Sequence, residues 1–255
     1  MIGLPLGESA MSNAIMSNAI VSNAIVTSRR RLFTALACGC AAAAGFGGTP
    51  GFAASGTHST LTADEALRRL KTGNTTFIEG ASCTPAGGEA HIAPLAEGQA
   101  PFAVIVGCSD SRTPPEYLFD GHLGELFIVR VAGNTVDDAA LGSIEYGVAV
   151  LGAPLVLVLG HSGCGAVAAA TNVVTQSTVY PGAIGRMVEP IVPAVRKAQA
   201  MEGDLMANAV RVNVEMVLAR ITSSSETVKQ AREAGKVRLA GAVYDLASGQ
   251  VKFIG

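Results

Sequence analysis

The stretch that decides the fold reads Val104-Ile-Val-Gly-Cys-Ser-Asp-Ser-Arg112. Its apolar part, residues 102–106, is short and rich in β-branched side chains, which predicts a buried strand. Directly behind that strand come a thiol, a carboxylate and a guanidinium at alternate positions, Cys108, Asp110 and Arg112. Open α/β sheets bind their ligands at the carboxyl ends of parallel strands. This polar triplet is therefore a candidate functional site.

A second stretch repeats the pattern. The apolar run 155–159 predicts another strand, and it is followed by Gly160-His161-Ser-Gly-Cys164-Gly. The glycines permit a tight turn, so that His161 and Cys164 can face one ion. If the two strands are neighbours, Cys108 joins them, and two thiolates with one imidazole are ligands that zinc prefers. We expect a zinc site made of Cys108, His161 and Cys164.

The fourth zinc position separates two kinds of site. With water bound there, zinc lowers the pKa of that water to near 7 and supplies hydroxide, while Asp110, held ionised by Arg112, orients the nucleophile. With Asp110 as the fourth ligand, the site is closed and inert. That closed form would be a structural Cys₂HisAsp site. A surface ion pair with unrelated thiols is the other reading that the spacing allows.

The rest of the chain predicts an α/β domain. Further strands are expected at 126–131, 237–244 and 250–254. Strands that alternate with helices favour a mainly parallel sheet of about four strands plus an edge strand, flanked by helices, with the last two strands close enough to form a hairpin at one edge. Expected helices are 137–150, 164–171 and two or three amphipathic helices over 185–235.

An earlier helix is expected after the capping box Thr62-Ala-Asp-Glu65, with Gly73 at the position just past its C-terminus. Residues 80–100 read as an arm or loop. His58, His91 and His122 have no partner at ligand spacing, and we expect no functional role for them. Cys83 is expected to be a small buried or half-buried thiol.

The composition argues against nucleic acid as a partner. The 255 residues carry a formal net charge of −2, and 49% of them are hydrophobic, enough for a substantial core. A weakly acidic balance gives no electrostatic basis for nucleic-acid binding. Of five cysteines, Cys38 and Cys40 lie in a segment that we expect to be removed, and the remaining odd number at wide spacing does not indicate a disulfide framework.

The N-terminal region predicts an export signal. A pentapeptide ending in Ser-Asn-Ala-Ile occurs three times over residues 11–25, and its period fits neither helix nor strand. Ser28-Arg-Arg-Arg-Leu-Phe33, a mild apolar run and small residues then resemble a twin-arginine signal. A basic arm that touches an anionic surface is the alternative. The apolar run is too short to span a bilayer.

We therefore expect residues 1–54 to be low-complexity sequence and export signal, and residues 55–255 to be one catalytic α/β domain. The expected location is the periplasm, with the thylakoid lumen or secretion as alternatives.

These motifs resemble those of the β-class carbonic anhydrases. Cys108-Ser-Asp-Ser-Arg112 and His161-Ser-Gly-Cys164-Gly stand in the order and at the separation of that family, and the similarity covers essentially the whole region from Thr62 onward. The resemblance implies a zinc enzyme in which Cys108, His161 and Cys164 hold the metal. It also implies that Asp110 and Arg112 form the catalytic pair.

The resemblance implies further site residues. Gln99 matches a glutamine that hydrogen-bonds substrate, and Phe127 and Tyr146 match apolar residues that line the CO₂ pocket. A branched aliphatic of that pocket aligns with Ala132, which leaves a roomier pocket. The chain has no Trp, so the Trp-centred bicarbonate regulation of some family members is not expected.

The family implies a four-stranded parallel core flanked by helices. It also implies a homodimer or higher oligomer with active sites at the subunit interface, where Gln99 and Tyr146 can act on the partner's zinc. The expected activity is zinc-hydroxide-catalysed interconversion of CO₂ and bicarbonate. Hydrolysis of CS₂ or COS at the same zinc remains an alternative, as does a non-enzymatic protein in which zinc is a structural clamp.

Overall fold

The computed structural model describes residues 58–80 and 92–254, all within one compact unit, Thr49–Gly255. The pentapeptide repeat and the expected export signal lie outside the described residues, as do Cys83 and His91. Within the described part, none of the helices combines the length and the hydropathy needed to cross a bilayer.

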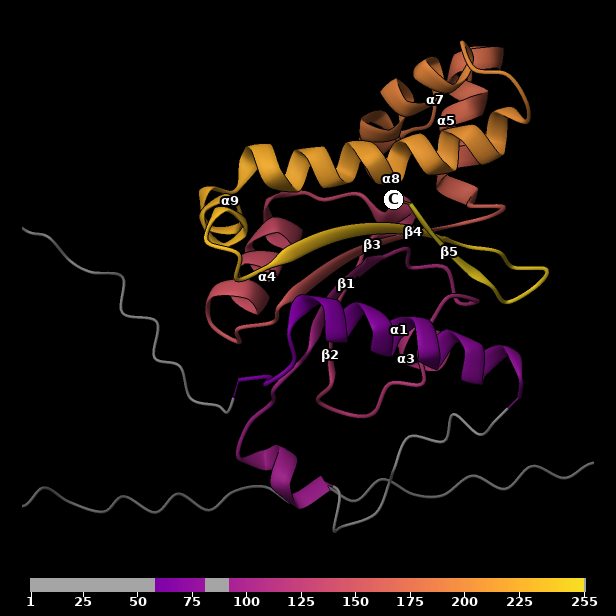
Figure 1. The fold of residues 1–255 in the computed structure, drawn as a ribbon. Coiled ribbons are helices and arrows are strands. Elements are labelled where there is room, and N and C mark those ends of the chain that lie inside the picture. The colour runs from indigo at the N-terminus through magenta and orange to yellow at the C-terminus, as the bar shows by residue number, and fades with distance from the viewer. Residues whose placement is uncertain (1–57, 81–91, 255) are drawn as a thin grey trace, which may run out of the picture. The chain divides into compact units, whose positions relative to one another are not determined.

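Five strands form one sheet in the order β2-β1-β3-β4-β5 (Figure 1). The first four are parallel to their neighbours, and β5 runs antiparallel to β4. The predicted mainly parallel sheet with a terminal hairpin at its edge is therefore confirmed. The strands are β1 (Ala103–Gly107), β2 (Leu126–Arg130), β3 (Leu155–His161), β4 (Arg238–Tyr244) and β5 (Val251–Ile254).

The two central strands are apolar because helices cover both faces of the sheet. Every residue of β1 and β3 is buried, and alternate side chains point to opposite faces. Val104 and Val106 pack toward α4 (Asp138–Ala149) and α8 (Leu205–Ser224), whereas Ile105 packs toward α1 (Ala63–Ile78). Figure 1 shows α8 and α1 on opposite sides of the sheet.

Helix α1 begins as predicted but does not end as predicted. The side chains of Thr62 and Glu65 form the reciprocal capping box. The prediction that Gly73 follows the end of the helix is wrong, because α1 continues to Ile78. Gly73 instead permits close packing: a Cβ there would lie 1.9 Å from the carbonyl oxygen of Phe119.

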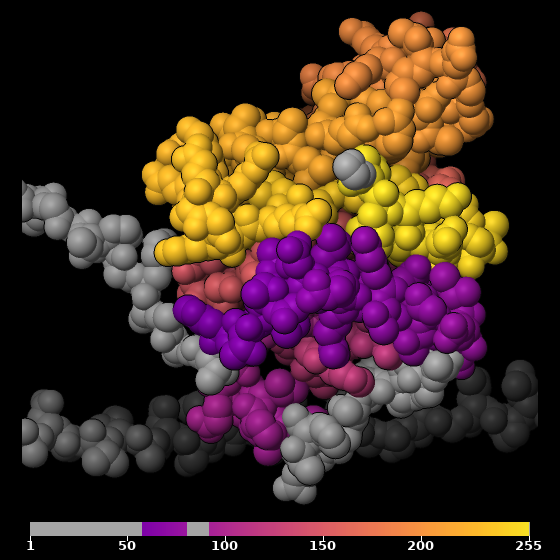
Figure 2. All heavy atoms as spheres, in the orientation of Figure 1, coloured from indigo at the N-terminus to yellow at the C-terminus, as the bar shows by residue number. Residues whose placement is uncertain are grey.

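The C-terminal hairpin lies beside α1, as the space-filling view shows (Figure 2). Buried Asn74 joins them, since its Nδ2 donates to the carbonyl oxygen of Gly249 at 2.9 Å and its Oδ1 accepts from the backbone N–H of Val251 at 2.8 Å. These bonds fasten α1 to the turn between β4 and β5.

Between β3 and β4 the chain is mostly helical, as expected. The prediction of two or three helices over 185–235 is confirmed, because three helices lie wholly within that range and two of them begin at the N-caps Asp204 and Ser225. A further helix begins before the range, at Gly182. The helices after β3 are α5 (Gly165–Gln176), α6 (Gly182–Val188), α7 (Val192–Ala198), α8 and α9 (Glu226–Glu233). Short elements are α3 (Pro115–Leu118), η1 (Ala93–Ala96), η2 (Ala132–Asn134) and η3 (Glu189–Ile191).

Candidate metal centre

The parallel pairing of β1 and β3 brings the two motifs together. Gly107 stands opposite Leu159 in the ladder, so Cys108, just past β1, meets His161, the last residue of β3. Cys164 is the N-cap residue of α5. The two sulfurs and a ring nitrogen of His161 all lie within 4.8 Å of one another, and all three residues are buried. The predicted ligand triplet is thus one cluster.

The orientation of His161 leaves one nitrogen available to a metal. Its Nδ1 lies 3.0 Å from the carbonyl oxygen of Ser162. Because a carbonyl can only accept, Nδ1 carries the proton and Nε2 keeps its lone pair. That Nε2 is buried and has no hydrogen-bond partner among the described residues. A buried unsatisfied polar atom costs about 1–3 kcal/mol, and a cation between the three side chains would satisfy it.

The two thiols share their charge unequally. The hydrogen bond from Cys164 lowers the pKa of Cys108, and contacts with His161 and the backbone N–H of Gly133 lower it further. The resulting Cys108 thiolate, together with burial, raises the pKa of Cys164. A cation between them would favour two thiolates, since thiolates are the metal-binding form. Two sulfurs and one imidazole nitrogen are a donor set that fits zinc.

Asp110 lies next to the cluster but is bound to Arg112. The guanidinium donates from Nε to Oδ1 at 2.9 Å and from Nη2 to Oδ2 at 2.7 Å, and the backbone N–H of Arg112 donates to Oδ1 at 3.0 Å. These bonds hold the pKa of Asp110 well below its usual range. Asp110 Oδ2 is 3.9 Å from His161 Nε2, so a charged acceptor lies at the edge of the metal centre.

Arg130 also supports this loop, and the sequence did not single it out. Its Nε donates to the carbonyl oxygen of Cys108 at 2.7 Å and its Nη2 to that of Asp110 at 2.5 Å. The side chain therefore fixes the backbone that carries a ligand and the carboxylate. The only hint would have been the ladder register, which pairs Arg130 with Gly107.

The remaining predicted residues lie away from the metal cluster of their own chain. Gln99 is exposed and precedes β1, whereas Cys108 follows it, so the length of the strand, roughly 16 Å, separates them. Phe127 pairs with Val104 near the start of β2. Tyr146, which is 47% exposed, packs on Phe127 with ring centroids 6.1 Å apart. Ala132, by contrast, packs against the buried cluster that includes Cys108.

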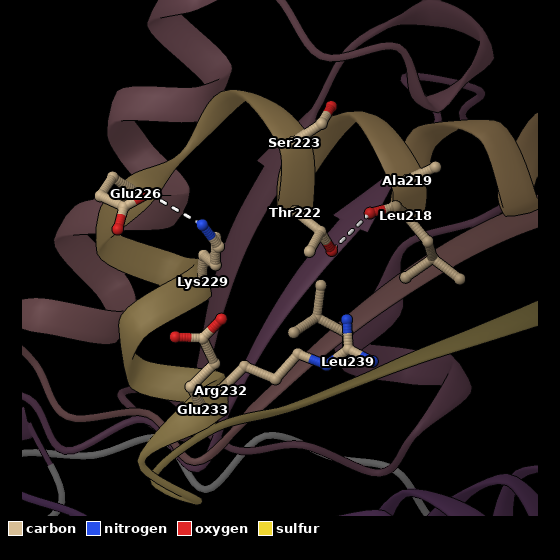
Figure 3. Close-up of a pocket in the computed structure, with 9 residues that line it drawn as sticks. All are labelled: Leu218, Ala219, Thr222, Ser223, Glu226, Lys229, Arg232, Glu233 and Leu239. Carbon is tan, nitrogen blue, oxygen red and sulfur yellow. Dashed lines mark hydrogen bonds and ion pairs between the residues drawn. The ribbon is translucent and has the colours of Figure 1, made fainter.

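A hollow elsewhere on the molecule holds none of the predicted site residues. It has a volume of about 920 Å³ and lies between α8, α9 and the start of β4 (Figure 3). Leu218 and Leu239 line it, and Glu226 and Lys229 pair with each other there at 3.5 Å. This hollow is not part of the candidate metal centre.

Comparison with known proteins gives a consistent result. Residues 103–251 match a family model described as carbonic anhydrase. The carbonic anhydrase of Mycolicibacterium smegmatis is 39% identical over 190 residues, which cover 73% of this chain and 91% of that protein. Carbonic anhydrase 2 of Mycobacterium tuberculosis is 39% identical over 189 residues, 72% of this chain and 89% of that protein.

A similar solved structure comes from work on two tetrameric β-carbonic anhydrases of Sordaria macrospora. It superposes with a TM-score of 0.58 at 27% identity, over 66% of this chain and 87% of the other. The relatives are matched over most of their length.

Proposed function

The chain belongs to the β-class carbonic anhydrase family, and from this premise we propose that it catalyses the reversible hydration of CO₂ to bicarbonate and a proton. One observation carries the proposal: the Cys108, His161 and Cys164 ligand atoms lie within 4.8 Å of one another, beside a carboxylate that Arg112 holds. A ligand triplet without the carboxylate could bind zinc but could not orient a water, and the carboxylate without the triplet could not activate one.

Cys108, His161 and Cys164 would hold zinc. Bound there, the ion would supply Lewis-acid chemistry that makes water nucleophilic near neutral pH. The residues around it prepare the attack. Arg112 keeps Asp110 ionised and fixed, and Asp110 accepts a hydrogen bond from the attacking water, so that the water directs a lone pair at the carbon of CO₂.

Zinc needs Asp110 to stay off the metal for this role. Two guanidinium bonds and one backbone N–H bond hold the carboxylate, and a fourth ligand taken from Asp110 would have to break some of them. We assign Asp110 and Arg112 to the open, catalytic arrangement. In our proposal, Asp110 is therefore not a zinc ligand in the resting enzyme near neutral pH.

The substrate pocket is completed by a second copy of the chain. Gln99 lies a strand's length from its own Cys108. Phe127 lies on the edge strand β2, and Tyr146 is an exposed residue of α4. A partner placed against this edge would bring its Gln99 and aromatic pair to the metal centre. The tetrameric Sordaria structure supports a homo-oligomer.

Subunit mixing tests the shared site. A Cys108→Ser chain lacks a ligand and a Gln99→Leu chain lacks the substrate contact, and each is expected to be inactive or weak alone. If Gln99 serves the partner, unfolding and refolding a mixture creates hybrid dimers with one intact site, and activity returns. No gain over the two parents would contradict the sharing.

The sulfur substrates remain the second candidate because Ala132, which aligns with a branched aliphatic residue of the family's pocket, packs against the buried cluster that includes Cys108. Assaying CO₂, COS and CS₂ on one zinc-loaded preparation decides between them. We expect CO₂ hydration to dominate. Zinc removal should abolish activity, and Cys108→Ser with full CO₂ hydration would contradict the proposed function.

We also propose that the protein is exported. The proposal rests only on the sequence Ser28-Arg-Arg-Arg-Leu-Phe33, which resembles a twin-arginine signal. A twin-arginine route carries folded proteins, so the thiolates can bind zinc before they meet an oxidising compartment. Replacing Arg29 and Arg30 with Lys should leave active enzyme in the cytoplasm. Normal export of that double variant in cell fractionation would contradict the route.

A further inference from the structure

The sulfur of Cys108 receives a hydrogen bond from a loop outside both ligand motifs. The backbone N–H of Gly133, in η2, donates to Cys108 Sγ at 3.2 Å, and both groups are buried. A donor aimed at a thiolate stabilises its negative charge and withdraws electron density from the sulfur. Whatever fixes this loop therefore influences the metal centre.

The loop has a backbone conformation that requires glycine at position 133. Gly133 has φ of 71°, a conformation that side chains rarely adopt. A Cβ at this position would lie 2.5 Å from Ile191 Cδ1 and 3.0 Å from Ala166 Cβ. The next residue, Asn134, is also left-handed, with φ of 47°. A non-glycine residue keeps this conformation only where surrounding contacts hold it.

Asn213 supplies that contact. It lies in α8, it is 2% exposed, and its Nδ2 donates to the carbonyl oxygen of Gly133 at 2.9 Å across 80 residues of sequence. A buried amide within an apolar helix face is costly unless it is hydrogen-bonded. Its neighbours Val212 and Val214 are fully buried. The hydrogen bond to Gly133 therefore accounts for an asparagine at this buried position.

The helix that carries Asn213 is itself closely seated on the sheet. A Cβ on Gly160, the residue before ligand His161, would lie 2.7 Å from Val214. A Cβ on Gly241 of β4 would lie 2.9 Å from the same side chain. Two glycines, one on each of two neighbouring strands, therefore let α8 approach the sheet one residue from Asn213. The backbone position of Asn213 is therefore fixed relative to the sheet, so its side-chain amide can hold the loop in place.

We propose that Asn213 is a positioning residue for the metal centre: by holding the carbonyl of Gly133, it keeps the N–H of Gly133 on the sulfur of Cys108. This inference rests on the metal site of the proposed function. The residue acts through the Gly133 backbone and does not touch the metal or the substrate. Without it, the loop relaxes, the N–H leaves the sulfur, and the thiolate becomes more electron-rich and less well oriented.

Cobalt replaces zinc in the test because its bond to thiolate absorbs light, and the energy of that charge-transfer band reports the charge on the sulfur. Asn213→Leu has a similar volume and suits the apolar surroundings, and Asn213→Ala removes the side chain. Both are expected to shift the band to longer wavelength. Both are also expected to lower metal affinity, measured by chelator competition, by roughly 10-fold, the lower end for outer-shell changes.

Ile221→Val is the matched control. Ile221 is fully buried in α8, about two turns further along, and its truncation should destabilise the fold without moving the band. The cobalt band of the Asn213 variants staying at the wild-type position, with wild-type affinity, would overturn the proposal. Equal shifts in Ile221→Val would overturn it too, because they would show a general effect of destabilisation.

A wild-type measurement keeps the proposal testable if the variants fail to fold. With the spin-active isotope of cadmium bound, the amide proton of Gly133 should show scalar coupling to the metal through the sulfur. Absence of that coupling overturns the proposal while leaving the metal site intact. A wild-type chain with no thiolate-to-cobalt band overturns the metal site of the proposed function and this proposal with it.

Discussion

Arg112 holds Asp110 with two donors on one edge of its guanidinium, at 2.9 Å from Nε to Oδ1 and 2.7 Å from Nη2 to Oδ2. The two residues are separated by one serine, so the loop itself supplies the arrangement. A two-point contact fixes the plane of the carboxylate as well as its charge. That carboxylate lies 3.9 Å from the free nitrogen of His161.

Asp110→Asn should lower kcat/KM for CO₂ hydration by about 100-fold or more, because the amide can present an N–H to the attacking water instead of an acceptor. Zinc content should stay near wild type, as no ligand changes, and the melting temperature should fall only by the contribution of the ion pair with Arg112. Asp64→Asn is the control, since Asp64 is exposed and pairs with Arg238 on the surface at 2.6 Å. Wild-type kinetics in Asp110→Asn would contradict the role.

The Asp110–Arg112 pair has a defined signature in stability against pH. Arg112 lowers the pKa of Asp110 in the folded protein. The stability it contributes is therefore fully present above the unfolded carboxyl pKa of about 3.9, and it is lost as pH falls through the lower folded pKa.

The matching measurement is urea unfolding of wild type and Arg112→Met across acid pH. Their difference in free energy of unfolding should be constant from neutral pH down to about pH 5 and shrink below about pH 4. Both proteins are compared metal-free, because Asp110 can reach the metal once Arg112 is gone and zinc would then not cancel in the difference. A difference that vanishes near pH 6 would show that another group titrates.

Two glycine substitutions in helices should act in opposite directions. Gly73→Ala places a Cβ 1.9 Å from the carbonyl oxygen of Phe119, so α1 must move off the core, at a cost of about 3 kcal/mol. Gly142→Ala in α4 meets nothing within 4 Å, so it should stabilise by roughly 0.5–1 kcal/mol through helix propensity. Chemical denaturation of both variants checks the signs, and a neutral Gly73→Ala would contradict the packing.

Zinc removal should lower the melting temperature of wild type, since it leaves two buried thiols and the Nε2 of His161 without a common partner. Cys108→Ser is the comparison, because a chelator should change its melting temperature little once a ligand is lost. Calorimetry with and without chelator measures both. An equal chelator effect on the two proteins would place the stabilising metal elsewhere.

The sheet and the metal ligands were predictable because their signals are local. β1 and β3 are continuous apolar runs that end at polar motifs, and neighbouring parallel strands bring such ends together. Gly73 was misassigned because its signal is ambiguous: a glycine near a helix end is usually a terminator, and only the path of the chain at Phe119 reveals the packing reason.

Arg130 and Asn213 could not be found in the sequence for a different reason. Both act on backbone atoms, across 22 and 80 residues of sequence. An arginine at a strand end or an asparagine in a helix has many uses, and only the register of β2 on β1 and the seating of α8 select the one observed. Gln99 and Tyr146 lie away from the cluster of their own chain, so their assignment depends on a partner.

Stopped-flow CO₂ hydration by the purified protein, from about pH 6.5 to about pH 9 with bound zinc assayed on the same samples, tests whether the zinc site is open and catalytic. We expect activity that is proportional to zinc content and still present at neutral pH, because Arg112 keeps Asp110 off the metal. Full zinc occupancy with activity only in the alkaline range would contradict the open arrangement. Full occupancy with no CO₂ hydration at any pH would contradict the proposed function itself.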